Sequence, residues 1–277
     1  MFRIQKISDY GTANPIVARL SLQTQDLLPF YNLTDKQKEE VFGLFFSSLQ
    51  PKLMTCFRIM EQLTKEVRER QKKIDEAGLE FQAQGRAYTL PSILDLQHRA
   101  ESFLYNGKSV LRDLTDIFSI LFSKDFKKEA RFDKVLKWAK KEFGPDDPLT
   151  KMLEDDANTW IKKIVRMRNA VEHPGGYSGV LHIENFSSIE EVTKVLVIEP
   201  LWYLNTEAKV PIVYEMEAFV SNLLTFCEEI LVLSIEKFKK APILIAEIPE
   251  KDRNSQCPKR FKVVLDESKV KRPDKKD

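Results

Sequence analysis

The chain has 277 residues, of which 43% are hydrophobic and 31% are charged, so it can form a large globular core and is far too apolar for wholesale disorder. Its 44 lysines and arginines nearly balance 42 acidic residues, so an anionic ligand must be held by a local cluster rather than by the net charge of +2. Three widely spaced cysteines, without histidine or cysteine at ligand spacing, predict neither disulfides nor a zinc site. We expect no metal and no cofactor.

Residues 1–33 mix apolar and polar side chains without a sustained period, which predicts an extended N-terminal arm or a short strand. The first residues lack the apolar core of a signal peptide, and no run approaches the roughly 18 apolar residues of a membrane span. We therefore expect a cytoplasmic protein that does not associate with membranes.

Between Thr34 and about residue 240, apolar residues recur every three or four positions, which is the spacing of amphipathic helices. Thr34 and Gln37 have the arrangement of a capping box that begins the first helix, and Ser92 is the expected N-cap of the next one. That second helix keeps its apolar stripe through Leu121. Three further helices are expected over about residues 127–143, 149–172 and 211–240.

Two stretches rich in β-branched and aromatic residues interrupt the helical pattern between about residues 180 and 204, and they predict a β-hairpin. The end of the chain is expected to hold one strand at Phe261–Leu265 and a charged, disordered tail from Ser268. The predicted fold class is all-α. It consists of an antiparallel helical bundle over residues 34–240 with a small inserted β-hairpin, flanked by extended terminal arms at 1–33 and 241–277.

The helix predicted over residues 149–172 ends in the stretch MRNAVEHPGG, in which Arg168 occupies a position of the apolar stripe. Pro174 disfavours the α conformation at His173, and the two following glycines can adopt left-handed conformations. The helix is therefore expected to end beside His173 and to leave its imidazole at a frayed edge. The last helical carbonyls and Glu172 favour the charged form of the imidazole, so we expect His173 to donate or accept a proton near neutral pH.

The side chains of this stretch can act together on a phosphate. Arg168 offers a planar guanidinium for two phosphate oxygens, and Asn169 can hydrogen-bond the histidine ring or a ligand. An arginine and a histidine suit attack of an RNA 2′-hydroxyl on the adjacent phosphate, in which His173 moves a proton and Arg168 stabilises the developing charge. The same residues also fit an ordinary helix end, with Arg168 and Glu172 as an i, i+4 ion pair and His173 as a cap residue.

The six residues RNAVEH, 168–173, resemble the Arg-x4-His signature of the HEPN superfamily (higher eukaryotes and prokaryotes nucleotide-binding), in which a polar residue, commonly asparagine, follows the arginine. The earlier stretch FLYNGKSVLRDLTDIF resembles the helix that packs behind the motif in such domains. This resemblance implies a helical bundle whose motif helices pair across a homodimer and form a metal-independent endoribonuclease cleft. Family members act in toxin–antitoxin systems and antiviral defence, and others keep the bundle for binding without activity.

On this resemblance, Arg168 and His173 are the catalytic pair, Asn169 assists them, and RNA is the substrate. Arg166 and Tyr177 are the further residues expected to bind RNA. The alternative function is a non-catalytic HEPN-like module that binds a nucleotide, an RNA or a protein partner.

The chain departs from one pattern that the resemblance brings with it. Many HEPN toxins carry a tyrosine two residues after the histidine, and a partner antitoxin modifies it. Here that position is Gly175, and the nearest tyrosine is Tyr177. Regulation by an antitoxin or another protein partner therefore stays open.

Overall fold

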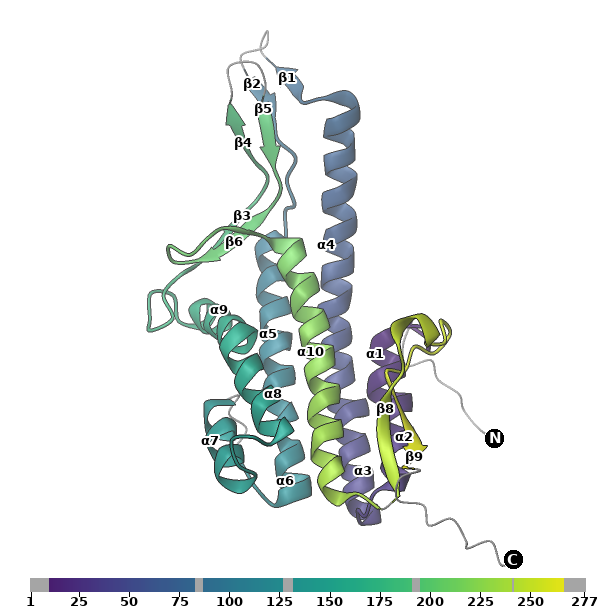
Figure 1. Cartoon of the computed structure of the whole chain (residues 1–277). Helices are drawn as coiled ribbons and strands as arrows, with labels where there is room; N and C mark the ends of the chain where they lie inside the picture. The colour runs from purple at the N-terminus through teal and green to yellow at the C-terminus, as the bar shows by residue number, and fades with distance from the viewer. Residues whose placement is uncertain (1–9, 83–86, 127–131, 191–194, 241, 267–277) are drawn as a thin grey trace, which may run out of the picture. The chain divides into compact units, whose positions relative to one another are not determined.

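The computed structural model describes residues 10–82, 87–126, 132–190, 195–240 and 242–266 (Figure 1). Helices make up about 63% of the described residues and strands 15%, and the strands pair into small antiparallel sheets. The protein is therefore of mixed α/β class with helices dominant, and the prediction of an all-α fold is wrong. Helical periodicity identified most of the helices but not the short strands in segments of weak periodicity. The tail from Ser268, predicted to be disordered, lies outside the described residues.

The chain divides into two compact units, each assembled from separate stretches of sequence. Unit 1 comprises residues 1–51, 110–155 and 224–277, and unit 2 comprises residues 52–109 and 156–223. The helical elements of unit 1 among the described residues are α1 (Pro15–Val17), η1 (Ala18–Leu22), α2 (Gln23–Leu27), η2 (Leu28–Phe30), α3 (Asp35–Gly43), η3 (Leu44–Leu49), the start of α4 (Gln50–Ala77), the end of α5 (Leu96–Leu114), α6 (Asp116–Phe122), α7 (Phe132–Glu142), α8 (Pro148–Asp156), the end of α10 (Ile212–Ile235), η6 (Glu236–Phe238) and η7 (Glu250–Asp252).

The N-terminal segment is helical from α1 to η2, so the prediction of an extended arm is wrong. Asn14 caps this segment, because its Oδ1 accepts the N–H of Ile16 at 2.9 Å. The buried face carries the polar residues Ser21, Gln23 and Thr24, and η1 is a π-helical turn that departs from the 3.6-residue repeat. Because of both features, apolar residues in this segment do not recur at the three- or four-residue spacing by which the other helices were predicted.

The C-terminal segment of unit 1 forms a two-stranded antiparallel sheet of β8 (Ile243–Glu247) and β9 (Phe261–Leu265). β9 confirms the predicted strand, whereas its partner β8 was not predicted. Gln23 connects this sheet to the helices: its Oε1 accepts the N–H of Phe261 at 2.7 Å, and its Nε2 donates to the fully buried Glu228 at 2.8 Å. The segment is therefore packed against the helices of unit 1 and is not an extended arm.

Helix starts follow the prediction where the capping groups are local. Thr34 and Gln37 form the predicted capping box, with Thr34 Oγ1 accepting the N–H of Gln37 at 3.2 Å. α5 instead begins after the predicted N-cap Ser92, at a point fixed by a distant residue. Asn185 Oδ1 accepts the N–H of Ile93 at 3.1 Å, and Asn185 Nδ2 donates to the Ile93 carbonyl at 2.8 Å. This tertiary contact holds the segment before α5 outside the helix.

Unit 2 contains most of the strands. Its elements among the described residues are the remainder of α4, β1 (Glu80–Gln82), β2 (Ala87–Thr89), the start of α5, η5 (Ala157–Ile161), α9 (Lys162–Glu172), β3 (Leu181–Glu184), β4 (Ser187–Glu190), β5 (Val195–Ile198), β6 (Leu201–Leu204), β7 (Val210–Pro211) and the start of α10. The predicted hairpin at 180–204 is therefore more elaborate than expected. β3 pairs with β6 and β6 with β7, while β4 pairs with β5, all antiparallel.

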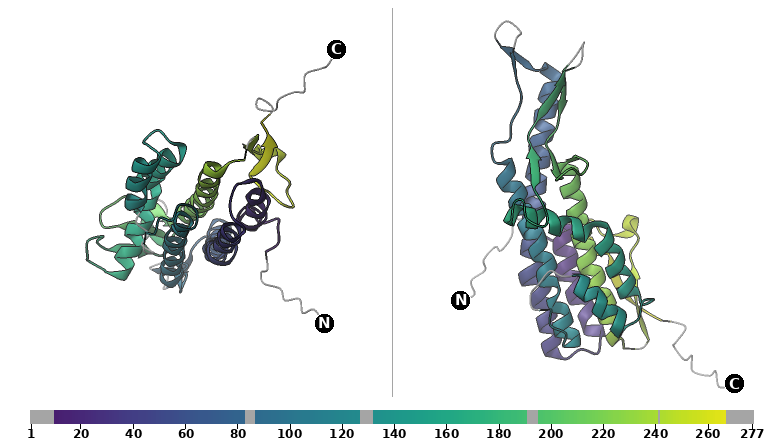
Figure 2. Two further views of the ribbon diagram at one scale, coloured as in Figure 1. Left: turned by 90° about the horizontal axis from the view of Figure 1, so that it is seen from below. Right: turned by 90° about the vertical axis from the view of Figure 1, so that its left-hand side faces the viewer.

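A second hairpin, β1–β2, was not predicted from the sequence. Tyr88 Oη lies 2.8 Å from Ser188 Oγ, so the hairpins β1–β2 and β4–β5 lie side by side (Figure 1 and Figure 2). Strands of three or four residues give too short an alternation to be recognised in a sequence. The contact between Tyr88 and Ser188 also joins segments 100 positions apart in the chain.

Close packing of α5 and α9 in unit 2 depends on Gly107. A Cβ atom at this position would lie 2.7 Å from Cδ1 of Ile164 on α9, so glycine allows the two helices to approach closely. Trp202 of β6 is fully buried, with its ring centroid 6.4 Å from those of both Phe103 and Phe219. Helices and sheet of unit 2 thus share one core.

α10 has the length and composition of a membrane-spanning helix. The segment Ile212–Phe238 includes an 18-residue window with a mean hydropathy of 1.6. Of that window, 67% is buried inside the fold, and the core helix of a soluble protein passes the same test.

Candidate functional site

α9 ends at the predicted position. His173 leaves the α conformation, with φ −135° and ψ 72°, while its N–H still donates to the Asn169 carbonyl at 2.9 Å. Gly175 has the left-handed φ of 75°, and its N–H donates to the Gly179 carbonyl at 2.9 Å, which closes a turn after the helix. Of the two glycines that can adopt this conformation, Gly175 does so and Gly176 does not. His173 is exposed at this helix end.

Arg168 is buried, with 9% of its surface exposed. Its Nη2 lies 2.9 Å from Glu172 Oε1, and its guanidinium carbon lies 5.2 Å from the centroid of the Tyr105 ring, which is a cation–π contact. Its Nη1 is buried and has no hydrogen-bond partner among the described residues. A buried donor without a partner is costly, so this nitrogen would gain from an acceptor that the described part of the chain does not supply.

Lys108 of α5 joins the same group of side chains. Its Nζ donates to Asn169 Oδ1 at 2.8 Å and to Glu172 Oε2 at 3.1 Å. The neighbouring Gly107 makes this reach possible, because α5 and α9 pack closely there. We call the following residues the Arg168 cluster: Tyr105, Lys108, Arg168, Asn169 and Glu172.

Glu172 is the common partner of both cations, with Arg168 at one carboxylate oxygen and Lys108 at the other. Partial burial raises the pKa of Glu172, but the hydrogen bond from Lys108 and the nearby charges of Lys108, Arg168 and His173 outweigh burial, so its pKa lies below the usual range. Glu172 is therefore ionised at neutral pH. The cluster then carries two positive charges and one negative charge.

The two residues predicted to bind RNA lie outside the Arg168 cluster. Arg166 Nη1 is 3.0 Å from Glu207 Oε1, and the Arg166 side chain is 46% exposed. Tyr177 is fully exposed in the turn after the helix. The structure thus brings Arg168 and Asn169 together through Lys108 and Glu172 and leaves Arg166 and Tyr177 as accessible neighbours along the chain.

Sequence reasoning missed Tyr105 and Lys108. They are three residues apart and share a face of α5. Gly107, at which α9 comes close to α5, lies between them in the sequence. A glycine inside a strongly apolar helix often marks such an approach, and Gly107 was the available signal for a contact between these helices.

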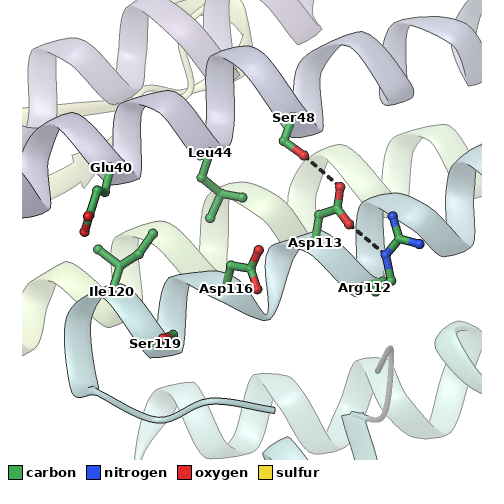
Figure 3. Close-up of a pocket in the computed structure, with 8 residues that line it drawn as sticks. All are labelled: Glu40, Leu44, Ser48, Arg112, Asp113, Asp116, Ser119 and Ile120. Carbon is green, nitrogen blue, oxygen red and sulfur yellow. Dashed lines mark hydrogen bonds and ion pairs between the residues drawn. The ribbon is translucent and has the colours of Figure 1, made fainter. Parts of the chain in front are cut away.

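A cavity of about 690 Å³ lies in unit 1 between α3–η3 and α5–α6 (Figure 3). Asp113 accepts hydrogen bonds from Arg112 Nε at 2.8 Å and from Ser48 Oγ at 2.7 Å. Glu40 and Asp116 also line the cavity, so its acidic side chains outnumber Arg112. This charge balance disfavours a phosphate or another anion.

Among the described residues, no group of three or more His, Cys, Asp or Glu side chains could hold a metal ion. Comparisons with protein-family models, with curated proteins and with solved structures find no match for the chain.

Proposed function

We propose that the Arg168 cluster binds a phosphate of RNA and that His173 takes part in metal-independent cleavage of the RNA beside it. The observation that carries the proposal is the convergence of Lys108 and Arg168 on the two oxygens of Glu172, next to an exposed histidine. A carboxylate held in this way occupies the place of two phosphate oxygens. The resemblance of residues 168–173 to the Arg-x4-His signature of HEPN ribonucleases supports the same assignment.

In the free protein, Glu172 competes with that phosphate. Bound RNA displaces the carboxylate from Lys108 and Arg168, and one anion replaces another, so both cations keep a counter-charge. Arg168 Nη1, which lacks a partner among the described residues, gains an acceptor in the exchange.

In the proposed reaction, the 2′-oxygen forms a bond to phosphorus and the bond from phosphorus to the 5′-oxygen breaks. The products are a 2′,3′-cyclic phosphate and a 5′-hydroxyl. A neutral His173 accepts the 2′-hydroxyl proton, and the departing 5′-oxygen receives a proton from an acid. One imidazole cannot accept and donate in the same step, which favours a homodimer whose second His173 is the acid. Arg168 and Lys108 stabilise the charge that develops on the phosphate oxygens.

The burial of Arg168 favours a second candidate, a non-catalytic module that binds RNA or a nucleotide. The guanidinium contacts the ring of Tyr105 and pairs with Glu172, as a structural ion pair does. In such a module Lys108 would contribute to phosphate affinity and His173 would have no role in turnover.

Cleavage of a mixed-sequence RNA in EDTA by the wild type and by His173→Ala tests the proposal. His98→Ala is the matched control, because His98 is an exposed histidine of α5. We expect cyclic phosphate ends, with a loss of roughly 10²- to 10⁴-fold in His173→Ala and no loss in His98→Ala. A wild-type protein that binds RNA without cleaving it would favour the second candidate, and full activity in His173→Ala would reject this site.

A further inference from the structure

A small cavity of unit 2 lies between α5, the end of α9 and β3. Its volume is about 140 Å³, well below the roughly 300 Å³ at which pockets for drug-sized ligands begin, so it suits a single flat heterocycle. Val171 and Pro174 line it, as do Leu181 and Ile183, which point to the same side of β3. These four aliphatic side chains can contact the faces of a nucleobase, and polar groups make up much of the rest of the lining.

The cavity adjoins the proposed cleavage site. Pro174, which lines it, follows His173 directly in the chain. Glu101 of the cavity and Lys108 lie on the same face of α5, seven residues and therefore about 10 Å apart along the helix axis. A nucleotide with its phosphate at the Arg168 cluster can thus place a base in or near the cavity.

Gln97 and Glu101 supply the polar groups of the cavity. Gln97 Nε2 donates to Glu101 Oε1 at 2.9 Å. This bond leaves the second carboxylate oxygen and the Gln97 carbonyl oxygen as acceptors and one N–H of Gln97 Nε2 as a donor, so acceptors outnumber donors on the polar side of the cavity. Guanine presents two adjacent donors, N1–H and the 2-amino group, whereas adenine, cytosine and uracil each place an acceptor beside their donor.

We infer that this cavity binds a guanine base of the RNA, with Glu101 and Gln97 accepting hydrogen bonds from N1–H and from the 2-amino group. The assignment rests on the proposed function, because the phosphate of the same RNA lies at the Arg168 cluster. Glu101 is then a specificity-determining residue, and cleavage takes place next to guanosine.

Binding of 2′-O-methyl RNAs tests this assignment apart from catalysis, because they lack the nucleophile and cannot be cleaved. Oligouridine with one guanosine, one inosine or one adenosine is compared for the wild type, Glu101→Gln, the cavity-filling Val171→Phe, and a control, Glu76→Gln, on the exposed surface of α4. We expect the wild type to bind the guanosine oligonucleotide about tenfold more tightly than the inosine one, which lacks the 2-amino donor. Both cavity variants lose this preference, and Glu76→Gln keeps it.

Equal affinity of the wild type for the three oligonucleotides overturns the assignment, even when the protein cleaves RNA. A preference for guanosine that survives in both folded cavity variants overturns it as well. A preference that the cavity variants lose, without any cleavage of ordinary RNA, supports the base site and rejects the nuclease. Absence of binding to every oligonucleotide rejects both.

Discussion

Replacing Glu172 with glutamine tests whether one carboxylate occupies the phosphate site of the free protein. The change is nearly isosteric and removes the charge that pairs with Arg168 and Lys108. The Glu172 side chain is 38% exposed, so solvent screens both pairs and each contributes at most about 1 kcal/mol. Loss of this competitor should strengthen RNA binding by about 1–2 kcal/mol, which corresponds to a five- to thirtyfold lower Kd.

Fluorescence anisotropy with a labelled 2′-O-methyl RNA measures this gain, which should shrink at higher salt because screening weakens contacts to phosphate. Glu154→Gln is the matched control, since the Glu154 side chain is 41% exposed and pairs with Lys140 outside the Arg168 cluster. Unchanged or weaker binding by a folded Glu172→Gln protein would refute the reasoning. An equal gain in Glu154→Gln would attribute the effect to net charge alone.

Three further predictions concern the free energy of unfolding. The pKa of Glu172 is lowered in the folded protein, so its ion pairs stabilise the fold above the unfolded pKa of about 4.3. This contribution disappears as the pH falls through the folded pKa. The free energies of unfolding of the wild type and Glu172→Gln, measured in urea, should therefore become equal in acid. Gly107→Ala places a Cβ 2.7 Å from a side-chain carbon of α9 and should cost about 1 kcal/mol in urea, whereas Gly43→Ala meets nothing within 4 Å and should stabilise by about 0.5–1 kcal/mol. Gly179→Ala combines a φ of +83° with overlap of the new Cβ and the Asn205 side chain, so thermal denaturation should show a loss of about 2 kcal/mol.

The helices that could be predicted are those whose folding information is local. α9 ends at Glu172 as predicted, because Pro174 cannot follow in a helix. The N-terminal helical segment escaped prediction because its buried face is partly polar, and Gln23 finds its partner Glu228 some 205 positions away. From the sequence alone, a polar residue such as Gln23 is expected at the surface, because its distant buried partner cannot be recognised.

Some residues of the Arg168 cluster could also be identified from local spacing, whereas others are brought together only by the fold. Arg168 occupies a position of the apolar stripe, and its spacing to Glu172 indicated an i, i+4 ion pair as the alternative to a catalytic site; this ion pair is present. Lys108 lies 61 positions from Asn169, and only the packing of α5 on α9 brings the two side chains together. Local spacing therefore identified half of the charge arrangement, and the second cation required the fold.

Arg168 is the residue at which a structural role and a functional role predict different outcomes. Its i, i+4 pair and its contact with Tyr105 together contribute about 1 kcal/mol, while a buried guanidinium nitrogen without a partner costs roughly 1–3 kcal/mol. These contacts therefore do not exceed the cost of burial, and leucine would suit the apolar stripe at least as well. We expect Arg168→Leu to leave the free energy of urea unfolding unchanged or higher and to abolish RNA binding. A loss of stability of several kcal/mol with unaltered RNA binding would instead make the arginine a structural ion pair.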